Sequence, residues 1–188
     1  MGFSLYLMRH CEPVPGHPNN AERALTEDGL KQAADMGAWL AGHIGRVDIV
    51  ITSPFMRAVQ TAQAMGKALG AHLADTRMLQ PDGNPDDMWK EIERLAQQSK
   101  DVLVVGHDPS LNALIGWLQG FDPNHEQEPL GPAELRLEWG SVASMTVKTT
   151  SGGGTAGTLQ WLVTPLIVLA QKEIVEAARE LVGILDAD

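Results

Sequence analysis

Two arginines and two histidines are the residues of this sequence best suited to chemistry: Arg9, His10, Arg57 and His107. Guanidinium groups stay protonated at neutral pH and bind phosphate oxygens through paired N–H donors. A neutral imidazole can attack phosphorus, and a second imidazole can donate to the transferred group. Together these residue types predict a site that binds a phosphate dianion and places a histidine to attack it.

The four residues lie at or just after the ends of predicted strands. Apolar runs at residues 3–8, 47–51 and 102–105 predict the strands, and the peptides RHCEP, TSPFMRA and GHDPSL follow them. In an open α/β sheet, ligands bind outside the carboxyl ends of the strands. We therefore expect the four side chains to meet in one crevice.

The remaining pattern predicts a three-layer α/β/α fold with a mostly parallel sheet and an antiparallel C-terminal hairpin. Thr26 is a candidate N-cap, and Ser53-Pro54 and Asp108-Pro109 each read as an N-cap followed by proline at the first helical position. Residues 121–132 are predicted to be a loop. Further helices are predicted over 88–98, 110–118 and 171–185, a short strand over 73–79, and hairpin strands over 141–149 and 158–164.

Length, charge and cysteine content limit the functional class. The 188 residues fit one domain, residues 1–188. The net charge of −10 argues against nucleic-acid binding and against a polybasic membrane anchor. One cysteine, Cys11, cannot form an internal disulfide, and no Cys/His spacing predicts a metal site. The N-terminus lacks the pattern of a signal peptide, so we expect a cytoplasmic protein.

Four motifs resemble those of the histidine phosphatase superfamily, also called phosphoglycerate mutase-like. The family's Arg-His-Gly stands here as Arg9-His10-Cys11. Leu-Thr-x-x-Gly-x-x-Gln-Ala stands at residues 25–33, Ser-Pro-x-x-Arg-Ala-x-Gln-Thr-Ala at 53–62 and Gly-His-x-Pro-x-Leu at 106–111. Four blocks in the family's order make a chance match very improbable. The chain most resembles the short SixA-type phosphohistidine phosphatases.

The resemblance implies a phosphatase that needs no metal or cofactor. His10 is then the nucleophile that forms a phosphohistidine intermediate, and Arg9, Arg57 and His107 bind and stabilise the phosphoryl group. Many family members place a glutamate before the fourth strand, where this chain reads LQPDG. An alkoxide leaving group needs such an acid more than an imidazole does. We therefore expect the substrate to be phosphohistidine in a signalling or phosphotransfer protein.

Two other functions stay open. One is a phosphatase for small phosphate esters, which needs only the same phosphate pocket. The other is a non-catalytic module that binds phosphorylated groups, suggested by the missing acid and by Cys11 in place of the motif glycine. Covalent labelling separates an enzyme from a module, because only an enzyme forms acid-labile phosphohistidine.

Three further residues are candidates for substrate contacts. Arg23 could reach the phosphate or remain a solvated loop charge, and Asn19 and Ser53 are candidates for contacts with phosphate oxygens. Cys11 has two interpretations. It either packs in the interior or is a redox-sensitive thiol whose pKa falls beside the cationic pocket.

Overall fold

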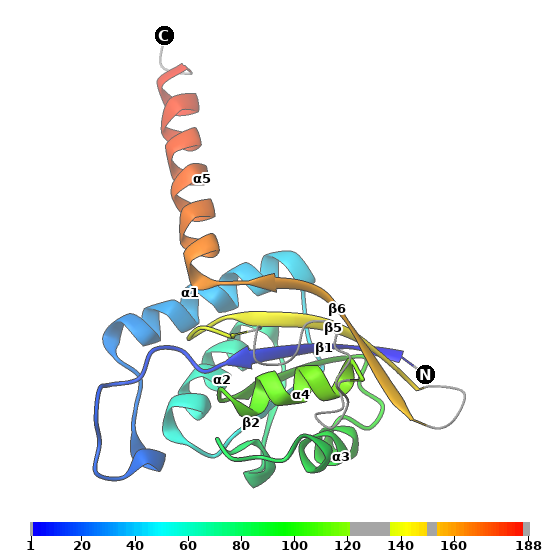
Figure 1. Cartoon of the computed structure of the whole chain (residues 1–188). Coiled ribbons are helices and arrows are strands. Elements are labelled where there is room, and N and C mark those ends of the chain that lie inside the picture. Colours follow the sequence, from blue (N-terminus) through cyan, green and yellow to red (C-terminus); the bar gives the residue numbers. More distant parts are fainter. Residues whose placement is uncertain (1, 121–135, 150–153, 186–188) are drawn as a thin grey trace.

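The chain forms one six-stranded sheet with helices on both faces (Figure 1). The computed structural model describes residues 2–120, 136–149 and 154–185. In order, the strands are β1 (Gly2–Arg9), β2 (Ile49–Thr52), β3 (His72–Asp75), β4 (Asp101–Gly106), β5 (Val142–Thr149) and β6 (Thr155–Val163). The helices are α1 (Glu27–Ile44), α2 (Met56–Leu69), α3 (Pro85–Leu95), α4 (Ser110–Leu118) and α5 (Pro165–Leu185), with 3₁₀ turns η1 (Asn20–Glu22) and η2 (Arg77–Leu79).

The strand order is β3-β2-β4-β1-β5-β6. The first four strands of the chain run parallel to one another, and β5 and β6 add an antiparallel hairpin beside β1. This mixed α/β sheet confirms the predicted fold class, hairpin included. The division of the chain into domains stays a prediction.

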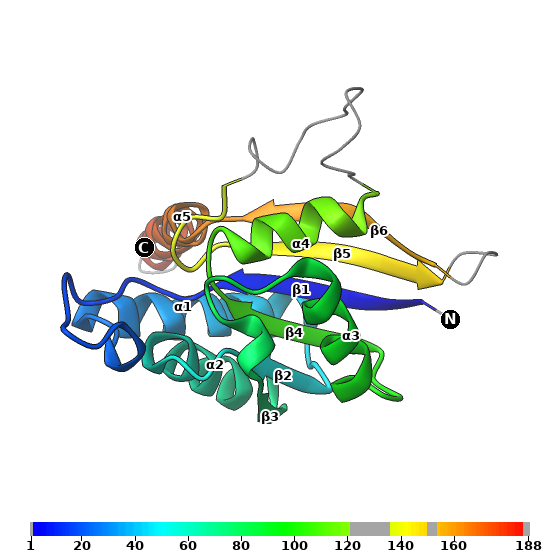
Figure 2. The same ribbon diagram turned by 60° about the horizontal axis from the view of Figure 1, so that its bottom comes forward.

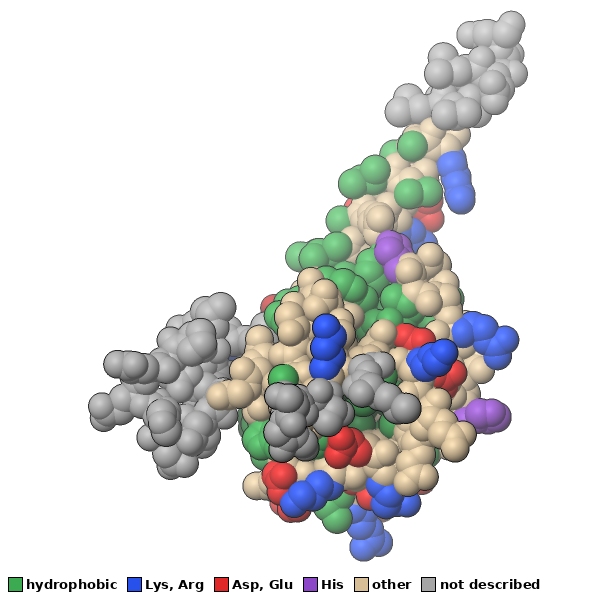
Figure 3. All heavy atoms as spheres, turned by 90° about the vertical axis from the view of Figure 1, so that its right-hand side faces the viewer, with side chains coloured by type: hydrophobic (Ala, Val, Ile, Leu, Met, Phe, Trp, Pro, Cys, Tyr) green, Lys and Arg blue, Asp and Glu red, His purple; other side chains and the backbone are tan. Residues whose placement is uncertain are grey.

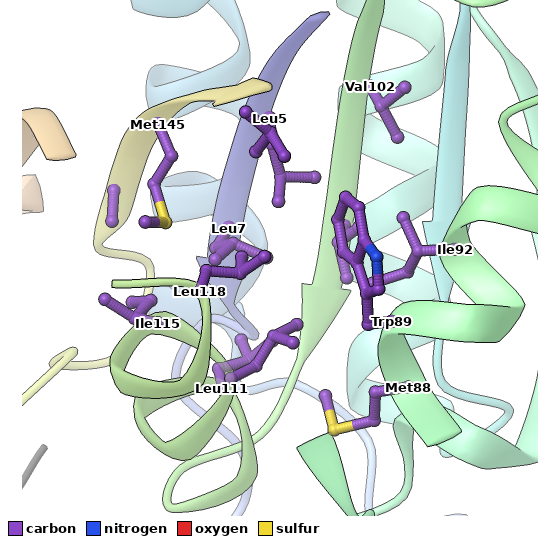
Figure 4. Close-up of a cluster of buried hydrophobic side chains, with 14 of the residues drawn as sticks. Leu5, Leu7, Met88, Trp89, Ile92, Val102, Leu111, Ile115, Leu118 and Met145 are labelled. Atoms are coloured by element: carbon purple, nitrogen blue, oxygen red, sulfur yellow. The ribbon is translucent and has the colours of Figure 1, made fainter. Parts of the chain in front are cut away.

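Helices α3 and α4 lie on one face of the sheet and α1 and α2 on the other (Figure 2), and an apolar cluster lies under each pair. Leu5 and Leu7 of β1 belong to the cluster under α3 and α4, which Figure 4 shows in close-up. Tyr6 and Met8 belong to the cluster under α1 and α2. Alternate residues of a strand point to opposite faces, so a strand covered on both sides must be apolar throughout. That requirement explains the uninterrupted apolar runs in β1 and β4.

The register of the parallel strands aligns their carboxyl ends. Arg9 of β1 pairs with Gly106 of β4, and Thr52 of β2 pairs with Val105. The residues that follow these strands therefore emerge along one edge of the sheet. Hydrogen bonds from the N–H of His10 to the carbonyl of Gly106 (3.0 Å), and from the N–H of Ser53 to that of Val105 (3.0 Å), extend the alignment into the loops.

Two predicted helix starts differ from the observed ones, although the Thr26 cap is confirmed. The Ser53-Pro54 prediction was wrong because α2 begins at Met56, and Ser53 Oγ instead accepts from the N–H of Phe55. The Asp108 cap was also wrong. Pro109 occupies the cap position of α4, and the Asp108 carboxylate is bound to other side chains.

The other differences concern element boundaries. Asn84 caps α3 through two backbone N–H groups, so that helix begins at Pro85 rather than at residue 88. The predicted strand 73–79 is divided into β3 and η2. Helix α5 begins at Pro165 rather than 171, because proline fits a first helical turn. The predicted loop 121–132 lies outside the described residues.

Candidate functional site

Arg57 lies between the two histidines. Its Nε donates to Nε2 of His10 at 3.0 Å, and its Nη2 lies 3.2 Å from Nδ1 of His107. Its Nη1 donates to the carbonyl of Asn20 at 2.8 Å. The imidazole rings of His10 and His107 meet edge to face with centroids 5.1 Å apart. The structure thus brings three of the four predicted residues into direct contact.

Hydrogen bonding defines the tautomer of both histidines. A backbone carbonyl can only accept, so Nδ1 of His10 carries the proton that it donates to the carbonyl of Cys11 at 2.7 Å. Nε2 of His10 therefore keeps its lone pair. A guanidinium can only donate, so Nδ1 of His107 accepts from Arg57, and its Nε2–H donates to Ser53 Oγ at 2.9 Å.

The site is cationic, and both imidazoles are neutral within it. Burial, together with the charges of Arg57, Arg9 and Arg23 and against the opposing hydrogen bond to the Cys11 carbonyl, lowers the pKa of His10 to about 3. Burial, followed by His10 and the same arginines, lowers the pKa of His107 to about 2. Burial and the other two arginines lower the pKa of Arg57 to about 10, so it stays charged at neutral pH. Three cations around two neutral imidazoles suit a dianionic ligand.

Arg9 is held by a ring of contacts at the edge of the site. Its Nη1 donates to the carbonyl of Leu137 at 2.8 Å and lies 3.5 Å from Oδ2 of Asp108. Asn112 completes the ring. Its Nδ2 donates to Oδ1 of Asp108 at 2.6 Å, and its Oδ1 accepts from the N–H of Leu137 at 3.4 Å. The ring fixes the guanidinium, whose Nε is buried and has no hydrogen-bond partner among the described residues.

Side chains of the second and third motifs hold the loop that follows His10. The Oε1 of Gln32 accepts from the N–H of Glu12 at 3.2 Å, and the Oε1 of Gln60 accepts from the N–H of Leu25 at 2.7 Å. Gly29 packs directly against the backbone of Glu12, where a side chain would clash. These motif residues therefore position the loop that carries Arg23, without contacting the histidines themselves.

Arg23 and Ser53 lie at the site in different roles. Arg23 is half-buried and contributes to the field on both histidines, and its Nε is buried without a hydrogen-bond partner in the described parts of the chain. This donor is available to a ligand oxygen. The Ser53 hydroxyl is instead bound to His107 and orients that ring.

Asn19 is not brought to the cluster. Its side chain is exposed, accepts from the N–H of Ala21 and donates to Glu22, and so caps η1. The neighbouring residue Asn20 contributes its backbone carbonyl to Arg57. Thus the 19–20 segment reaches the site through the main chain.

Cys11 is buried in the apolar cluster under α1 and α2. Its backbone N–H donates to Thr61 Oγ1 at 3.1 Å. Burial raises the pKa of its thiol to about 12, which is opposite to the fall that a redox-sensitive thiol would need. The position therefore supports the packing interpretation.

The prediction from sequence missed Asn112 and Trp139. Asn112 directly follows the fourth motif, so its place one turn into α4, beside Asp108, was available as a signal. Trp139, whose ring lies 5.7 Å from the guanidinium carbon of Arg9, had no sequence signal. It reaches Arg9 only because β5 pairs with β1.

Membrane-spanning helices and clusters of metal ligands are both absent from the part of the chain that the structure describes. None of the described helices combines the length and apolar character needed to cross a bilayer. Within the same residues, no group of three or more His, Cys, Asp or Glu side chains is arranged to hold a metal ion.

The sequence is similar to those of histidine phosphatases. Residues 5–80 match the model of the histidine phosphatase superfamily (branch 1). The chain is 25% identical to the phosphohistidine phosphatase SixA of Escherichia coli over 175 residues, which cover 92% of this chain and all of SixA.

Two solved phosphatase structures have a similar fold. A protein histidine phosphatase SixA, solved in complex with tungstate, superposes with a TM-score of 0.69 at 26% identity and covers 88% of this chain and 99% of that one. A mycobacterial glucosyl-3-phosphoglycerate phosphatase has the same fold, with a TM-score of 0.65 at 16% identity, over 85% of this chain and 98% of the other.

Proposed function

Because this chain belongs to the histidine phosphatase superfamily, we propose that it hydrolyses phosphohistidine in a protein, through a phosphorylated His10. One observation carries the proposal. His10 is neutral, and its unprotonated Nε2 directs a lone pair toward Arg57 inside a cationic pocket that also includes Arg9 and Arg23. Similarity to SixA proteins supports the phosphohistidine substrate, and the roles of the individual residues are part of the proposal.

In the first step, Nε2 of His10 attacks phosphorus in line and the bond from phosphorus to the substrate's imidazole breaks. The hydrogen bond from Arg57 Nε to Nε2 of His10 holds the His10 ring in place before the substrate arrives. When a phosphoryl group enters, its oxygens draw the guanidinium donors away and the lone pair becomes free. In the second step, water attacks phosphorus, the bond to Nε2 breaks, and inorganic phosphate leaves.

The arginines bind the phosphoryl oxygens and stabilise the charge that spreads over them in the transition state. The buried, unpartnered Nε atoms of Arg9 and Arg23 support this role, because an oxygen of the ligand would satisfy both. His107 has a proton on Nε2 and a lone pair on Nδ1 in the free protein. A bound dianion raises its pKa, so that it can gain a second proton and donate to the phosphoryl group.

The surroundings of His10 favour phosphohistidine over a phosphate ester. Among the described residues, every charged group that shifts the pKa values of His10 and His107 is a cation or the other imidazole. An alkoxide leaving group needs a nearby acid, whereas an imidazole with a protonated second nitrogen leaves as a neutral molecule. Asp108, the carboxylate at the edge of the site, pairs with Arg9 and Asn112 and does not shift the pKa of either histidine. A described site whose acid is held by an arginine therefore suits a phosphoramidate bond.

The test compares turnover of a phosphohistidine-bearing protein and p-nitrophenyl phosphate by the wild type, His10→Ala and His72→Ala. His72 is an exposed histidine of β3 and serves as the matched control. We expect faster turnover of phosphohistidine than of the ester, loss of both activities in His10→Ala, and wild-type rates in His72→Ala. A labelled phosphoryl group that passes from the substrate to the protein, is acid-labile and is absent in His10→Ala would identify the intermediate.

Other results would select the alternatives. Faster turnover of p-nitrophenyl phosphate would favour a phosphatase for small esters, a class that the mycobacterial neighbour represents. Folded protein that binds phosphate but turns over neither compound would favour the binding module. Activity retained in His10→Ala would remove His10 as the nucleophile.

A further inference from the structure

A groove of about 600 Å³ opens beside Arg9, between α1 and α5. Its apolar surface comes from Met36 of α1, from Trp139, and from Leu166 and Leu169 at the start of α5. Charged side chains of both signs border it. Lys172 of α5 forms an ion pair with Asp35 of α1 at 3.2 Å across one end. We call this surface the α1–α5 groove.

Arg9 belongs both to the groove and to the phosphate site. Its guanidinium lies over the ring of Trp139, which lines the groove, and its charge lowers the pKa of both His10 and His107. The groove therefore lies next to the part of the site that Arg9 forms.

The apolar surface beside Arg9 continues onto helix α5, whose exposed leucines a small substrate would not cover. Leu166 is 73% exposed and Leu169 45% exposed. Figure 1 shows α5 projecting away from the body, and Figure 3 shows hydrophobic side chains along that helix and on the body where it emerges. Its 21 residues correspond to about 32 Å at 1.5 Å per residue. A free phosphate ester would leave this surface in water, whereas a protein could cover it.

We propose that the α1–α5 groove binds the protein that carries the phosphohistidine, with an apolar helix face of that protein against Trp139, Leu166 and Leu169. The inference rests on the proposed function and adds the surface by which the substrate is recognised. Helices bind in grooves through apolar side chains one turn apart, surrounded by a rim of charged groups. The groove offers both parts beside Arg9 of the phosphate site.

The experiment introduces one negative charge on α5, either in the groove or outside it. Leu166→Glu and Leu169→Glu alter the groove, and Ile174→Glu is the matched control. Ile174 lies on the same helix, is 69% exposed and does not line the groove. Two substrates are compared: a four-helix phosphotransfer domain phosphorylated chemically on its histidine, and free phosphohistidine.

For the phosphorylated domain we expect kcat/KM to fall about tenfold in Leu166→Glu and Leu169→Glu, mainly through a higher KM, because a charge replaces an apolar contact at the interface. Both variants should hydrolyse free phosphohistidine at the wild-type rate. Ile174→Glu should match the wild type on both substrates.

Three results would overturn the inference. The first is an unchanged KM for the phosphorylated domain in both leucine variants. The second is an equal loss in Ile174→Glu, which would make the effect one of charge or of α5 outside the groove. In both cases hydrolysis of free phosphohistidine would leave the proposed function intact. The third is a wild type that hydrolyses neither substrate, which would overturn the proposed function and this inference together.

Discussion

His10 and His107 are two imidazoles held neutral by the same physical cause. Each is almost fully buried, and each faces arginines rather than a carboxylate in the described part of the chain. Proton uptake by either ring would add a charge to a site that already contains three cations. A neutral His10 is the form that the proposed attack on phosphorus requires, so the burial that costs solvation also favours the proposed role.

The buried histidines should make stability depend on pH in the acidic range. Both pKa values lie below the ordinary value of 6.5, at about 3 and about 2. Below pH 6.5 the unfolded chain binds these protons and the folded protein does not. The free energy of unfolding should therefore fall as pH decreases from about 6.5 to 3, by up to about 1.4 kcal/mol per pH unit for each histidine.

Urea denaturation at pH 7.5, 6 and 5 measures this dependence. Carboxylates also titrate in the lower part of this range, so His107→Gln serves as the control that removes one of the two histidines and leaves the carboxylates unchanged. We expect a smaller decrease with acid in this variant than in the wild type. If the free energy of unfolding decreased equally with pH in the two proteins, His107 would take up its proton in the folded state over the same pH range as in the unfolded chain.

Cys11 should resist thiol reagents in the native protein. It is fully buried, and burial raises its pKa to about 12, so the thiolate is scarce and inaccessible at neutral pH. We expect dithionitrobenzoate to react with one thiol in denaturant and with almost none in buffer. Cys11→Ser gives the background. Rapid labelling of the native protein would restore the redox interpretation.

The β4–α4 junction links the phosphate site to the segment before β5. Asn112, at the start of α4, binds both the Asp108 carboxylate and the backbone of Leu137, and each of these contacts Arg9. Asn112 is almost fully buried, so loss of its amide leaves partners unsatisfied. We infer that it is a positioning residue for Arg9.

Asn112→Ala should therefore weaken the binding of inorganic phosphate about tenfold, which corresponds to about 1.4 kcal/mol and lies in the range for a lost buried hydrogen bond. Calorimetric titration with phosphate measures it. Asn84→Ala is the matched control, because it removes the cap of α3 and should cost about 0.5–2 kcal/mol of stability without changing phosphate binding. Equal phosphate affinity in Asn112→Ala and the wild type would limit Asn112 to a structural role.

The two apolar clusters share the strands between them, which predicts that the molecule unfolds as one unit. Trp89 reports on the α3–α4 side, where it is buried, and Trp161 reports on the other side, beside Trp39 and Tyr6. In Trp89→Phe and in Trp161→Phe, the urea transition measured by fluorescence should coincide with that measured by far-ultraviolet circular dichroism. Separate transitions would contradict a single domain over residues 1–188.

Local patterns in the sequence predicted much of the fold. The apolar runs predicted β1, β2 and β4 because strands buried on both faces have few polar positions. The positions of helix starts were less accurate. Ser53 and Asp108 have the side chains of N-caps, yet His107 and Arg9 engage them in the folded protein. A residue with two possible hydrogen-bond partners cannot be assigned from its neighbours in sequence alone.

The motifs were sufficient to predict that Arg9, His10, Arg57 and His107 lie at one edge of the sheet, because the residue types and the strands before them are visible in short stretches of sequence. Their roles stay a prediction. The tautomers, the neutral state of both imidazoles, the contact of Asn112 with Asp108 and the groove beside Trp139 depend on tertiary structure. Hydrogen-bond partners and burial come from segments far apart in the chain. They exist only once the parallel register aligns the strand ends and β5 brings the residues before it to the edge of the site.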